Sequence, residues 1–492
     1  MAVFTYGADL PSFAVVHELY DLDSLELVDG DGTQATFEDE NGYQIVLTGT
    51  LFTYGSGIMT GGTVTGLNLL DDVGGDLLSV TGTNLDVLDL IAEFAGEPDL
   101  WQFLKLLSSG DDVHHGNDNG TVIMIADDHG DDEVFCGDGG SYVTGTEGND
   151  TLHGGADWDT LSYEETYWWQ DARFGIVLNA AKGTVTDSWR DKDTFSGFEE
   201  YGGSIFNDRM TGSKRDEAFK GLDGRDTIDG GKGQDQVRYH DDHRYDGEDG
   251  INANLTKGFV IDGFGKRDNV SNIEGVLGTN QDDKFVGSAA RNFFTGLDGV
   301  DSYDGGKGFG DIARFFYWND IGQGGIIVDM TLATGQVIND GFGNTETMKR
   351  IEGIDGSQFD DEIKLGKANG WIYADEGDDR LEAGTGQQWF SGGDGEDIFV
   401  FAALNTLGNK DTRDEIDDFD QGQGDQIDLS GIDGLFFGGE GAFSGEEGEI
   451  RYTIADEKTI IAIDTDGNGK ANYQIQVNRA VEFEEGDFIL SL

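Results

Sequence analysis

The chain contains almost no cysteine or proline. Its 492 residues include one cysteine, Cys136, and two prolines, Pro11 and Pro98, beside 79 glycines. A single cysteine excludes an intrachain disulfide framework, and many glycines with few prolines indicate a turn-rich β chain. No apolar run approaches the roughly 18 residues of a membrane span, and the first residues lack the basic start of a secretory leader. An exported chain would therefore carry its signal elsewhere.

Positive charge is also scarce. The chain has 98 acidic and 31 basic residues, for a formal charge of -67, and Lys105 is the only basic residue before Arg173. This balance excludes nucleic acid as a partner, because phosphate backbones require Lys and Arg. Repulsion at this charge opposes compaction unless cations bind, and carboxylates are ligands that calcium prefers. Acidic composition alone is also typical of disordered chains, but a regular repeat argues against disorder.

Four nonapeptides stand end to end over residues 203–238. They read GSIFNDRMT, GSKRDEAFK, GLDGRDTID and GGKGQDQVR, each close to G-G-x-G-x-D-x-U-x with U apolar. The glycines permit positive φ and a tight turn, and the acid at position six directs a carboxylate into that turn. The x-U-x part is a short strand. One nonapeptide is therefore half a coil of a parallel β solenoid.

The same register returns along the chain in four repeat blocks, at residues 127–162, 203–238, 278–313 and 356–400. Asp159, Asp235 and Asp311 are evenly spaced along the sequence, and Asp397 follows after a slightly longer interval. The connectors between the blocks, at residues 163–202, 239–277 and 314–355, share strand-like pairs and mostly an IEG motif. We interpret these connectors as strands that extend the stack, so that residues 107–400 form one solenoid.

Calcium sites are expected between turns that stack on each other. Two nonapeptides make one coil, so an ion needs acids from repeats n and n+2. The pairs with two carboxylates on one edge are Asp132 with Asp150, Asp208 with Asp226, Asp283 with Asp301, and the series Asp361, Asp379 and Asp397. On the opposite edge the candidates are Glu217 with Asp235, Asn292 with Asp311, and more weakly Ser141 with Asp159, whereas Gly370 and Gln388 supply no carboxylate. We expect about five firm sites, and the alternative for any single Asp is a capped turn without metal.

The N-terminal residues 1–106 carry no nonapeptide. Strand-like runs such as residues 43–51 alternate with Gly/Thr turns, and two apolar patterns of helical period follow over residues 87–94 and 100–107. We interpret this region as a small α/β cap that covers the first coil. A ligand-binding or catalytic domain is the alternative.

The C-terminal residues 401–492 resemble the C-terminal domain that serralysin-type metalloproteases share with other RTX proteins. The matching segments are GGDGEDIFVF (392–401), DEIDDFDQGQGDQIDLSGI (414–432), IDTDGNGKANYQIQV (463–477) and DFILSL (487–492). The resemblance implies a right-handed parallel β-roll with a β C-terminal cap, calcium ligation, and export from a Gram-negative bacterium by a type I secretion apparatus. Asp487 followed by Phe488, Ile489 and Leu490 resembles the uncleaved C-terminal signal of such proteins, and an ordinary last strand is the alternative.

One further acidic run lies within this C-terminal region. Asp464, Asp466 and Asn468 have the spacing of the first half of an EF-hand loop. Ile475 stands at position twelve, where an EF-hand needs a bidentate Glu. The run therefore indicates a turn or a surface calcium site, but no EF-hand.

No catalytic motif is found in the sequence. The H-E-x-x-H motif of metalloproteases is absent, since the nearest approach, residues 17–21, reads HELYD. His240 and His243 frame Asp241 and Asp242. That cluster has the residue types for zinc ligation or acid–base chemistry, although a solvated loop is the simpler interpretation.

Two functions remain open. The first is a non-enzymatic extracellular calcium-binding protein of a surface, adhesive or matrix type, and the second is a secreted lyase or epimerase with an acidic polysaccharide site on the solenoid. The first is favoured because no catalytic domain of the usual length precedes the repeats. Self-association or glycan attachment is expected through aromatic residues of the connectors, namely Tyr167, Trp168, Trp169, Phe316, Tyr317 and Trp318. Trp158 and Trp389 are further candidates for stacking on sugar rings, with packing between coils as the alternative.

Overall fold

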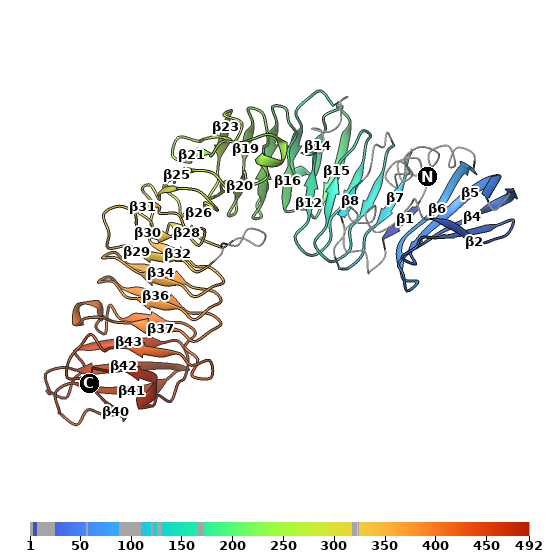
Figure 1. Cartoon of the computed structure of the whole chain (residues 1–492). Coiled ribbons are helices and arrows are strands. Elements are labelled where there is room, and N and C mark those ends of the chain that lie inside the picture. Colours follow the sequence, from blue (N-terminus) through green and yellow to red (C-terminus); the bar gives the residue numbers. More distant parts are fainter. Residues whose placement is uncertain are drawn as a thin grey trace. The chain divides into compact units, whose positions relative to one another are not determined.

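The computed structural model describes residues 3–6, 25–55, 58–87, 110–119, 122–124, 130–164, 172–316, 322 and 324–491. The contacts divide the chain into two compact units. Unit 1 comprises Met1–Val237 with Lys266–Ile273, and unit 2 comprises Arg238–Gly265 with Glu274–Leu492. Across these described residues the regular structure is β strand, interrupted by short 3-10 turns (Figure 1). Within the same residues, no helix is long and apolar enough to cross a membrane.

Unit 1 begins with an antiparallel meander. Its strands are β2 (Glu26–Gly30), β3 (Gln34–Glu38), β4 (Gln44–Gly55), β5 (Ile58–Leu70) and β6 (Asp76–Asp86). Strand β1 (Val3–Tyr6) pairs antiparallel with β6 and parallel with β7 (Val113–His115), the first strand of one solenoid sheet. The meander thus continues directly into the first coil. The helical patterns expected from residue 87 onward lie almost entirely outside the described residues.

The first repeat block and the strand just before it form two sheets of short strands. One sheet contains β9 (Glu133–Phe135) and β11 (Thr151–His153), and the other contains β8 (Val122–Met124), β10 (Tyr142–Thr144) and β12 (Thr160–Ser162). Parallel partners within the block come from repeats n and n+2, as in the pair Glu133 and Thr151. The central apolar residue of each repeat, such as Val134 or Leu161, is fully buried. The nonapeptide period therefore sets both the register and the core of a parallel β-roll.

The connector strands lie within the same stack. Residues 172–202 form β13 (Val177–Asn179), β14 (Thr184–Thr186), β15 (Lys192–Ser196) and β16 (Glu200–Gly202). Strand β15 is parallel to β11, β14 is antiparallel to both β13 and β15, and β13 is parallel to β17 (Arg209–Thr211). Strand β16 lies between β12 and β18 (Ala218–Lys220) on the other sheet. The last strands of unit 1 are β19 (Thr227–Asp229), β23 (Arg267–Ser271) and the first two residues of β20 (Gln236–Arg238).

Unit 2 repeats this plan. One series of strands contains β21 (Asn252–Asn254), β22 (Phe259–Ile261), β25 (Lys284–Val286), β27 (Ser302–Asp304), β31 (Thr347–Lys349), β30 (Val337–Asn339), β29 (Ile327–Asp329), β33 (Glu362–Lys364), β35 (Arg380–Glu382), β37 (Ile398–Val400) and β39 (Gln426–Asp428). The facing series contains β24 (Gly275–Leu277), β26 (Phe293–Thr295), β28 (Ile312–Arg314), β32 (Gly353–Asp355), β34 (Gly370–Tyr373), β36 (Gln388–Ser391) and β38 (Asp414–Ile416). The facing series is parallel throughout, from β24 to β38. The first series is interrupted at β30, which is antiparallel to β29, and then continues in parallel from β29 to β39.

The C-terminal region closes the stack of unit 2. Strands β40 (Phe436–Glu440), β41 (Glu449–Ala455), β42 (Lys458–Asp464) and β43 (Tyr473–Val477) pair in sequence, and β43 is parallel to β38. The last strand, β44 (Phe488–Ile489), is parallel to β39. Phe488 is buried against the rings of Phe437 and Phe483. Strand β44 is therefore packed onto the core through Phe488.

Candidate calcium sites on the stacked turns

The turn between β18 and β19 shows how the repeat arranges oxygen atoms. Leu222 and Gly224 have φ values of 60° and 153°. A β carbon at Gly224 would lie 2.6 Å from Asp226 Oδ1 and 2.7 Å from the carbonyl oxygen of Phe206, in the turn one coil earlier. Glycine therefore keeps open a small space that a carboxylate and a main-chain carbonyl border. Both are the hard oxygen ligands that calcium takes.

The same close approach recurs in other consensus turns. Gly148, Gly299, Gly377 and Gly395 occupy the same position and have φ values between 127° and 147°. A β carbon at Gly148 would overlap the carbonyl oxygen of Gly130, and one at Gly395 would overlap that of Gly377. The fourth residue of the repeat is thus glycine both for its φ and for the carbonyl below it.

The structure brings together every carboxylate pair that the sequence proposed. In each pair the backbone N–H of the earlier residue donates to the side chain one coil later. The N···O distances are 2.9 Å for Asp132 to Asp150, 2.7 Å for Asp208 to Asp226, 2.7 Å for Asp283 to Asp301, 2.7 Å for Asp361 to Asp379, and 3.1 Å for Asp379 to Asp397. On the opposite edge they are 2.9 Å for Glu217 to Asp235, 2.8 Å for Asn292 to Asp311, and 2.7 Å for Ser141 to Asp159. All of these side chains are buried.

The carboxylates differ in how their second oxygen is used. Asp208 and Asp361 each accept hydrogen bonds from the backbone N–H and hydroxyl of a serine in their own turn, at 2.7–2.8 Å. Among the residues that the structure describes, one buried Oδ2 atom has no hydrogen-bond partner in each of Asp150, Asp311, Asp379 and Asp397. A buried carboxylate oxygen without a partner is costly. A cation between the turns would remove that cost.

Burial also makes these carboxyl groups hard to ionise. It raises the pKa of Asp379 to about 9 and that of Asp150 to about 8, and the pKa values of Asp283 and Asp397 rise to about 7. Neighbouring carboxylates add to the effect, as Asp361 and Asp397 do at Asp379. At neutral pH the stack therefore needs either protons or cations.

Side chains alone do not complete a metal site. Over the described ranges, no group of three or more His, Cys, Asp or Glu side chains converges as metal ligands do. Each calcium ion would therefore need main-chain carbonyls, such as that of Phe206, beside the carboxylates. The residues present fit calcium on that condition, and its bound charge would stabilise the ionised carboxylates.

The ladders extend to residues that the sequence analysis missed. The N–H groups of Asp150, Asp226, Gln388 and Asp397 donate to Asp193, Asp268, Asp414 and Asp425, and those of Asp159 and Asp311 donate to Glu199 and Glu352. Asp193 and Asp268 begin the runs DTFS and DNVS, which match the second half of the nonapeptide without its glycines. Glu352 is the acid of the IEG motif. The second half of the nonapeptide, without its glycines, was the signal that could have identified Asp193 and Asp268.

Two sets of candidate residues have a different geometry. Asp464 accepts hydrogen bonds from the N–H groups of Asp466, Gly467, Asn468 and Gly469, at 2.7–3.3 Å. This is a capped turn whose own N–H groups occupy the carboxylate, so Asp464 and Asp466 are left out of the calcium proposal. Gly370 and Gln388 lie one above the other as expected, without a carboxylate of their own.

The histidine cluster belongs to a 3-10 turn, Asp242–Tyr245. His240 Nε2 lies 3.4 Å from Asp241 Oδ2, and His243 Nδ1 lies 2.8 Å from the carbonyl oxygen of His240. Asp242 is buried and accepts the N–H of Gly263 at 3.0 Å. These contacts are structural and do not bring the two imidazoles onto one metal position. The HELYD run at residues 17–21 lies outside the described residues.

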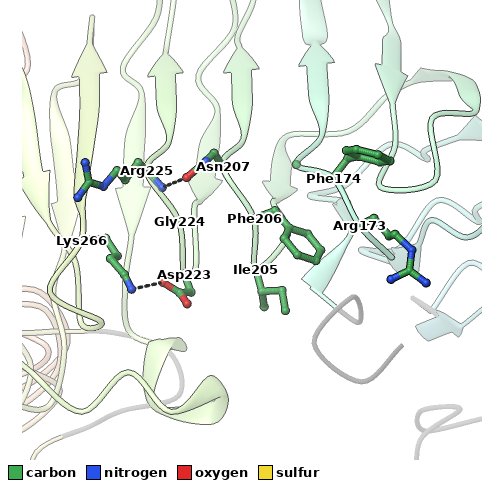
Figure 2. A pocket seen from close by; sticks show the side chains of 10 residues that line it. Arg173, Phe174, Ile205, Phe206, Asn207, Asp223, Gly224, Arg225 and Lys266 are labelled. Carbon is green, nitrogen blue, oxygen red and sulfur yellow. Dashed lines mark hydrogen bonds and ion pairs between the residues drawn. The ribbon is translucent and has the colours of Figure 1, made fainter. Parts of the chain in front are cut away.

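A hollow of about 520 Å³ lies on the outer side of the turns in unit 1 (Figure 2). Arg173, Arg225 and Lys266 line it together with the rings of Phe174 and Phe206. Lys266 Nζ lies 3.3 Å from Asp223 Oδ1, and the N–H of Arg225 donates to Asn207 Oδ1 at 2.8 Å. This basic hollow contrasts with one of about 410 Å³ in unit 2, which is lined by Asp375, Glu376, Asp394, Asp418 and Asp420 with Arg479.

A family model supports the same interpretation of the turns, and solved structures show further similarities. The model of the RTX calcium-binding nonapeptide repeat matches residues 136–165 and 202–241. Among solved structures, the AlgE6R2 subunit of the Azotobacter vinelandii mannuronan C5-epimerase is 23% identical over 28% of this chain and 93% of that chain, with a TM-score of 0.21. The extracellular lipase LipA from Serratia marcescens is 13% identical over 96% of this chain and 87% of that chain, with a TM-score of 0.18.

No curated protein sequence matches the chain. The model described as peptidase M10 serralysin C terminal matches residues 224–490, which is more than half of the chain. With its calcium-binding RTX repeats and β-roll, the chain belongs to the serralysin C-terminal family.

Proposed function

We propose that this chain is a secreted RTX protein that folds in extracellular calcium and acts without catalysis, as a surface, adhesive or matrix protein. The observation that carries the proposal is the ladder of buried carboxylates with oxygens that lack hydrogen-bond partners among the described residues, as in Asp379 and Asp397. Calcium supplies the missing positive charge there. The family assignment supports export as the step that delivers the chain to calcium.

Calcium concentration would decide where the chain folds. Extracellular calcium modules bind at roughly 10⁻⁴–10⁻³ M, well above the range of cytosolic calcium sensors. Without calcium, a formal charge of -67 opposes compaction. The chain would therefore remain unfolded inside the cell and fold outside it.

Circular dichroism tests this directly. Excess EGTA should abolish the β spectrum, and millimolar calcium should restore it. Magnesium at the same concentration is the matched control, because its preference for near-ideal octahedral geometry suits it poorly to sites built from flexible carbonyls. A β spectrum that is unchanged in EGTA would contradict the proposal.

Export is proposed to depend on the last residues, Asp487–Leu492. Their deletion should retain the protein in a Gram-negative host that carries a type I exporter. Because Phe488 is part of the core, the truncated chain should also be refolded in calcium and compared by circular dichroism. A truncated chain that folds but is retained supports a signal, whereas a truncated chain that is still secreted contradicts it.

Assembly through the connector aromatics remains a proposal. Tyr167, Trp168, Trp169, Tyr317 and Trp318 lie outside the described residues. Sedimentation at millimolar calcium, with and without the substitutions Trp168→Ala, Trp169→Ala and Trp318→Ala, measures self-association. A chain that stays monomeric at every calcium concentration contradicts it.

One observation favours the alternative of a polysaccharide-acting enzyme. The acidic hollow of unit 2 gathers four aspartates, a glutamate and one arginine on the turn face, and acidic groups serve as general acids and bases. Incubation of the calcium-loaded protein with alginate, followed by measurement of unsaturated ends and of uronate composition, distinguishes the two functions. Turnover that the substitution Asp394→Asn abolishes would establish the enzyme.

A further inference from the structure

Strands β34 and β36 are neighbours in unit 2 (Figure 1). Aromatic side chains gather on their outer face. Trp371 and Trp389 are register partners on these strands. Tyr373 lies two residues further along β34 and is 47% exposed, and Phe309 is 60% exposed with its ring centroid 6.2 Å from that of Trp371. These four residues line a hollow of about 370 Å³, here called the aromatic hollow, together with Arg291, Gly310 and Asp417.

A glycine fixes the indole of Trp371 against the sheet. Gly353 is its register partner in β32, and a β carbon at Gly353 would overlap Nε1 and the adjoining ring atoms. The far edge of the indole reaches Gly310, where a β carbon would lie 3.4 Å from Cη2. Gly353 does not have a positive φ. Glycine is therefore needed at this position to leave space for the indole, and not for the backbone conformation. The indole is therefore held in place before any ligand arrives.

Polar groups at the rim are also held in place. Arg291 Nε donates to the carbonyl oxygen of Gly310 at 3.1 Å, and its guanidinium lies 5.2 Å from the Trp371 ring centroid. Asp417 accepts a hydrogen bond from Asn478 Nδ2. Glu415, the register partner of Trp389, accepts from Gln476 Nε2 at 3.0 Å. The hollow thus combines flat aromatic surface with one donor group, Arg291, and one acceptor group, Asp417, of fixed orientation, and Glu415 lies beside Trp389 on the next strand.

We propose that the aromatic hollow binds an uncharged glycan. The C–H face of a pyranose ring packs against the electron-rich face of Trp or Tyr, and sugar hydroxyls both donate to carboxylates and accept from guanidinium. Fixed polar groups in a largely aromatic concavity of this volume are typical of small-ligand sites. Asp417, Glu415 and the overall charge of -67 oppose an anionic polysaccharide.

A second copy of the chain fits the hollow less well. It would carry the same large negative charge, and a stable protein interface needs on the order of 1,000 Å² of buried surface. Four aromatic side chains around one small hollow provide much less. The glycan site rests on the proposed extracellular role, because the hollow belongs to the folded chain that calcium is proposed to stabilise.

Titration calorimetry and tryptophan fluorescence test the site on the full chain in millimolar calcium. The probes are cellohexaose and maltohexaose as neutral glycans and an oligomannuronate as the anionic control. At least one neutral hexasaccharide should bind and change the tryptophan emission, and the oligomannuronate should not. Failure of both neutral probes at millimolar concentration overturns the inference, and so does preferential binding of the oligomannuronate.

Variants locate the site. Trp389→Ala should weaken binding by about tenfold, which is the scale of one aromatic stacking contact. Gly353→Ala should also weaken it, although all four aromatic residues remain, because it displaces the Trp371 indole. Phe174→Ala is the control, since Phe174 is a 41% exposed aromatic residue of unit 1 that does not line this hollow. Unchanged affinity in Trp389→Ala overturns the assignment. A chain that folds in calcium and ignores both neutral glycans refutes this inference while the calcium proposal stands.

Discussion

The coils of residues 356–428 have two edges that solve the same packing problem with different side chains. One edge, here called the acidic edge, stacks Asp361, Asp379 and Asp397 at the sixth position of alternate repeats. The other, here called the neutral edge, has Gly370 and Gln388 at that position. Both edges keep parallel pairing between repeats n and n+2. Their inward residues are equally buried, as Leu381 and Phe390 show. Coil stacking and core packing therefore do not require the carboxylates.

On the neutral edge the two N–H donor groups of Gln388 are bonded within the protein, and among the described residues its Oε1 is a buried atom without a hydrogen-bond partner. The N–H of Gln388 donates to Asp414 Oδ1 at 2.8 Å, and its side-chain Nε2 donates to the carbonyl oxygen of Ala368 at 3.1 Å. On the acidic edge, burial and neighbouring charge raise the pKa of Asp379 to about 9. A neutral side chain in place of Asp379 would destabilise the metal-free fold less than a buried carboxylate does. The comparison indicates that the acidic edge is specialised for a cation.

The largest expected effect is that of pH on the metal-free protein. The pKa values of Asp150, Asp379 and Asp397 are raised from 3.8 to between about 7 and about 9 in the fold. Protons on these groups stabilise the metal-free fold fully below about pH 4, and that stability is lost as pH rises through 7–9. Acidification from pH 9 to pH 5 should therefore partly replace calcium. Circular dichroism of chelator-dialysed protein measures this.

Calcium should reverse that pH dependence, because protons compete with the ion for the same oxygens. The calcium-loaded protein serves as the control and should keep its β spectrum at pH 9. A metal-free protein that gains structure as pH rises would contradict the assignment of these carboxylates.

Asp379→Asn should change stability in opposite directions with and without calcium. Asn can still accept the N–H of Asp361 but needs no proton to be buried, so the metal-free chain should gain on the order of a few kcal/mol at neutral pH. With calcium, the variant should bind fewer ions and need a higher calcium concentration to fold. Calorimetric stoichiometry and calcium titration by circular dichroism measure both effects.

The matched control lies on the neutral edge. Gln388→Asn should leave the calcium stoichiometry unchanged, because that turn has no carboxylate at position six. Equal loss of calcium in both variants would show that the two edges do not differ in function.

The sequence predicted much of this architecture because one motif sets turn, strand and register together. The pairing of Asp208 with Asp226 followed from the nonapeptide period alone. Asp193 and Glu352 were missed because the connectors keep the acid and lose the glycines. Trp371 was missed although it stands two repeats before Trp389, so the spacing applied to acids would also have paired the tryptophans.

The N-terminal junction had no such signal. Strand β1 pairs with β7 across a long stretch of sequence, through residues VFTY that match no repeat. The Tyr6 hydroxyl lies 3.1 Å from His114 Nδ1, and the Phe4 ring stacks on that imidazole at 4.5 Å. Burial lowers the pKa of His114 to about 3, so this histidine is a neutral core residue. Such long-range packing has no local pattern from which it could be predicted.

Glycine substitutions should destabilise the acidic edge more than the neutral edge, with a smaller effect on stability than the changes above. Gly377 has a φ of 127°, and a β carbon there would lie 2.7 Å from the carbonyl oxygen of Phe359 in the turn below. In the presence of calcium, Gly377→Ala should lower the free energy of unfolding by about 2 kcal/mol or more. The causes are backbone strain and displacement of the carbonyl oxygen that would bind the ion. Gly366, on the neutral edge, has no positive φ, and its nearest neighbour would be 3.1 Å away. Gly366→Ala should cost less than about 1 kcal/mol, and urea unfolding in calcium compares the two. Equal losses would show that the acidic turns are no more constrained.

The smallest effect is expected at position five, on the outer side of the turns. Asp360 Oδ1 accepts the N–H of Asp378 at 3.0 Å on the acidic edge, and Asn369 Oδ1 accepts the N–H of Gln387 at the same distance on the neutral edge. An amide oxygen therefore already performs this role in the neighbouring turn. Asp360 is exposed, so Asp360→Asn should change the free energy of unfolding by less than about 0.5 kcal/mol and leave the calcium stoichiometry intact. Urea unfolding and calorimetry measure both quantities, with Asp379→Asn as the comparison. Loss of an ion in Asp360→Asn would move the calcium site from the buried ladder to the outer one.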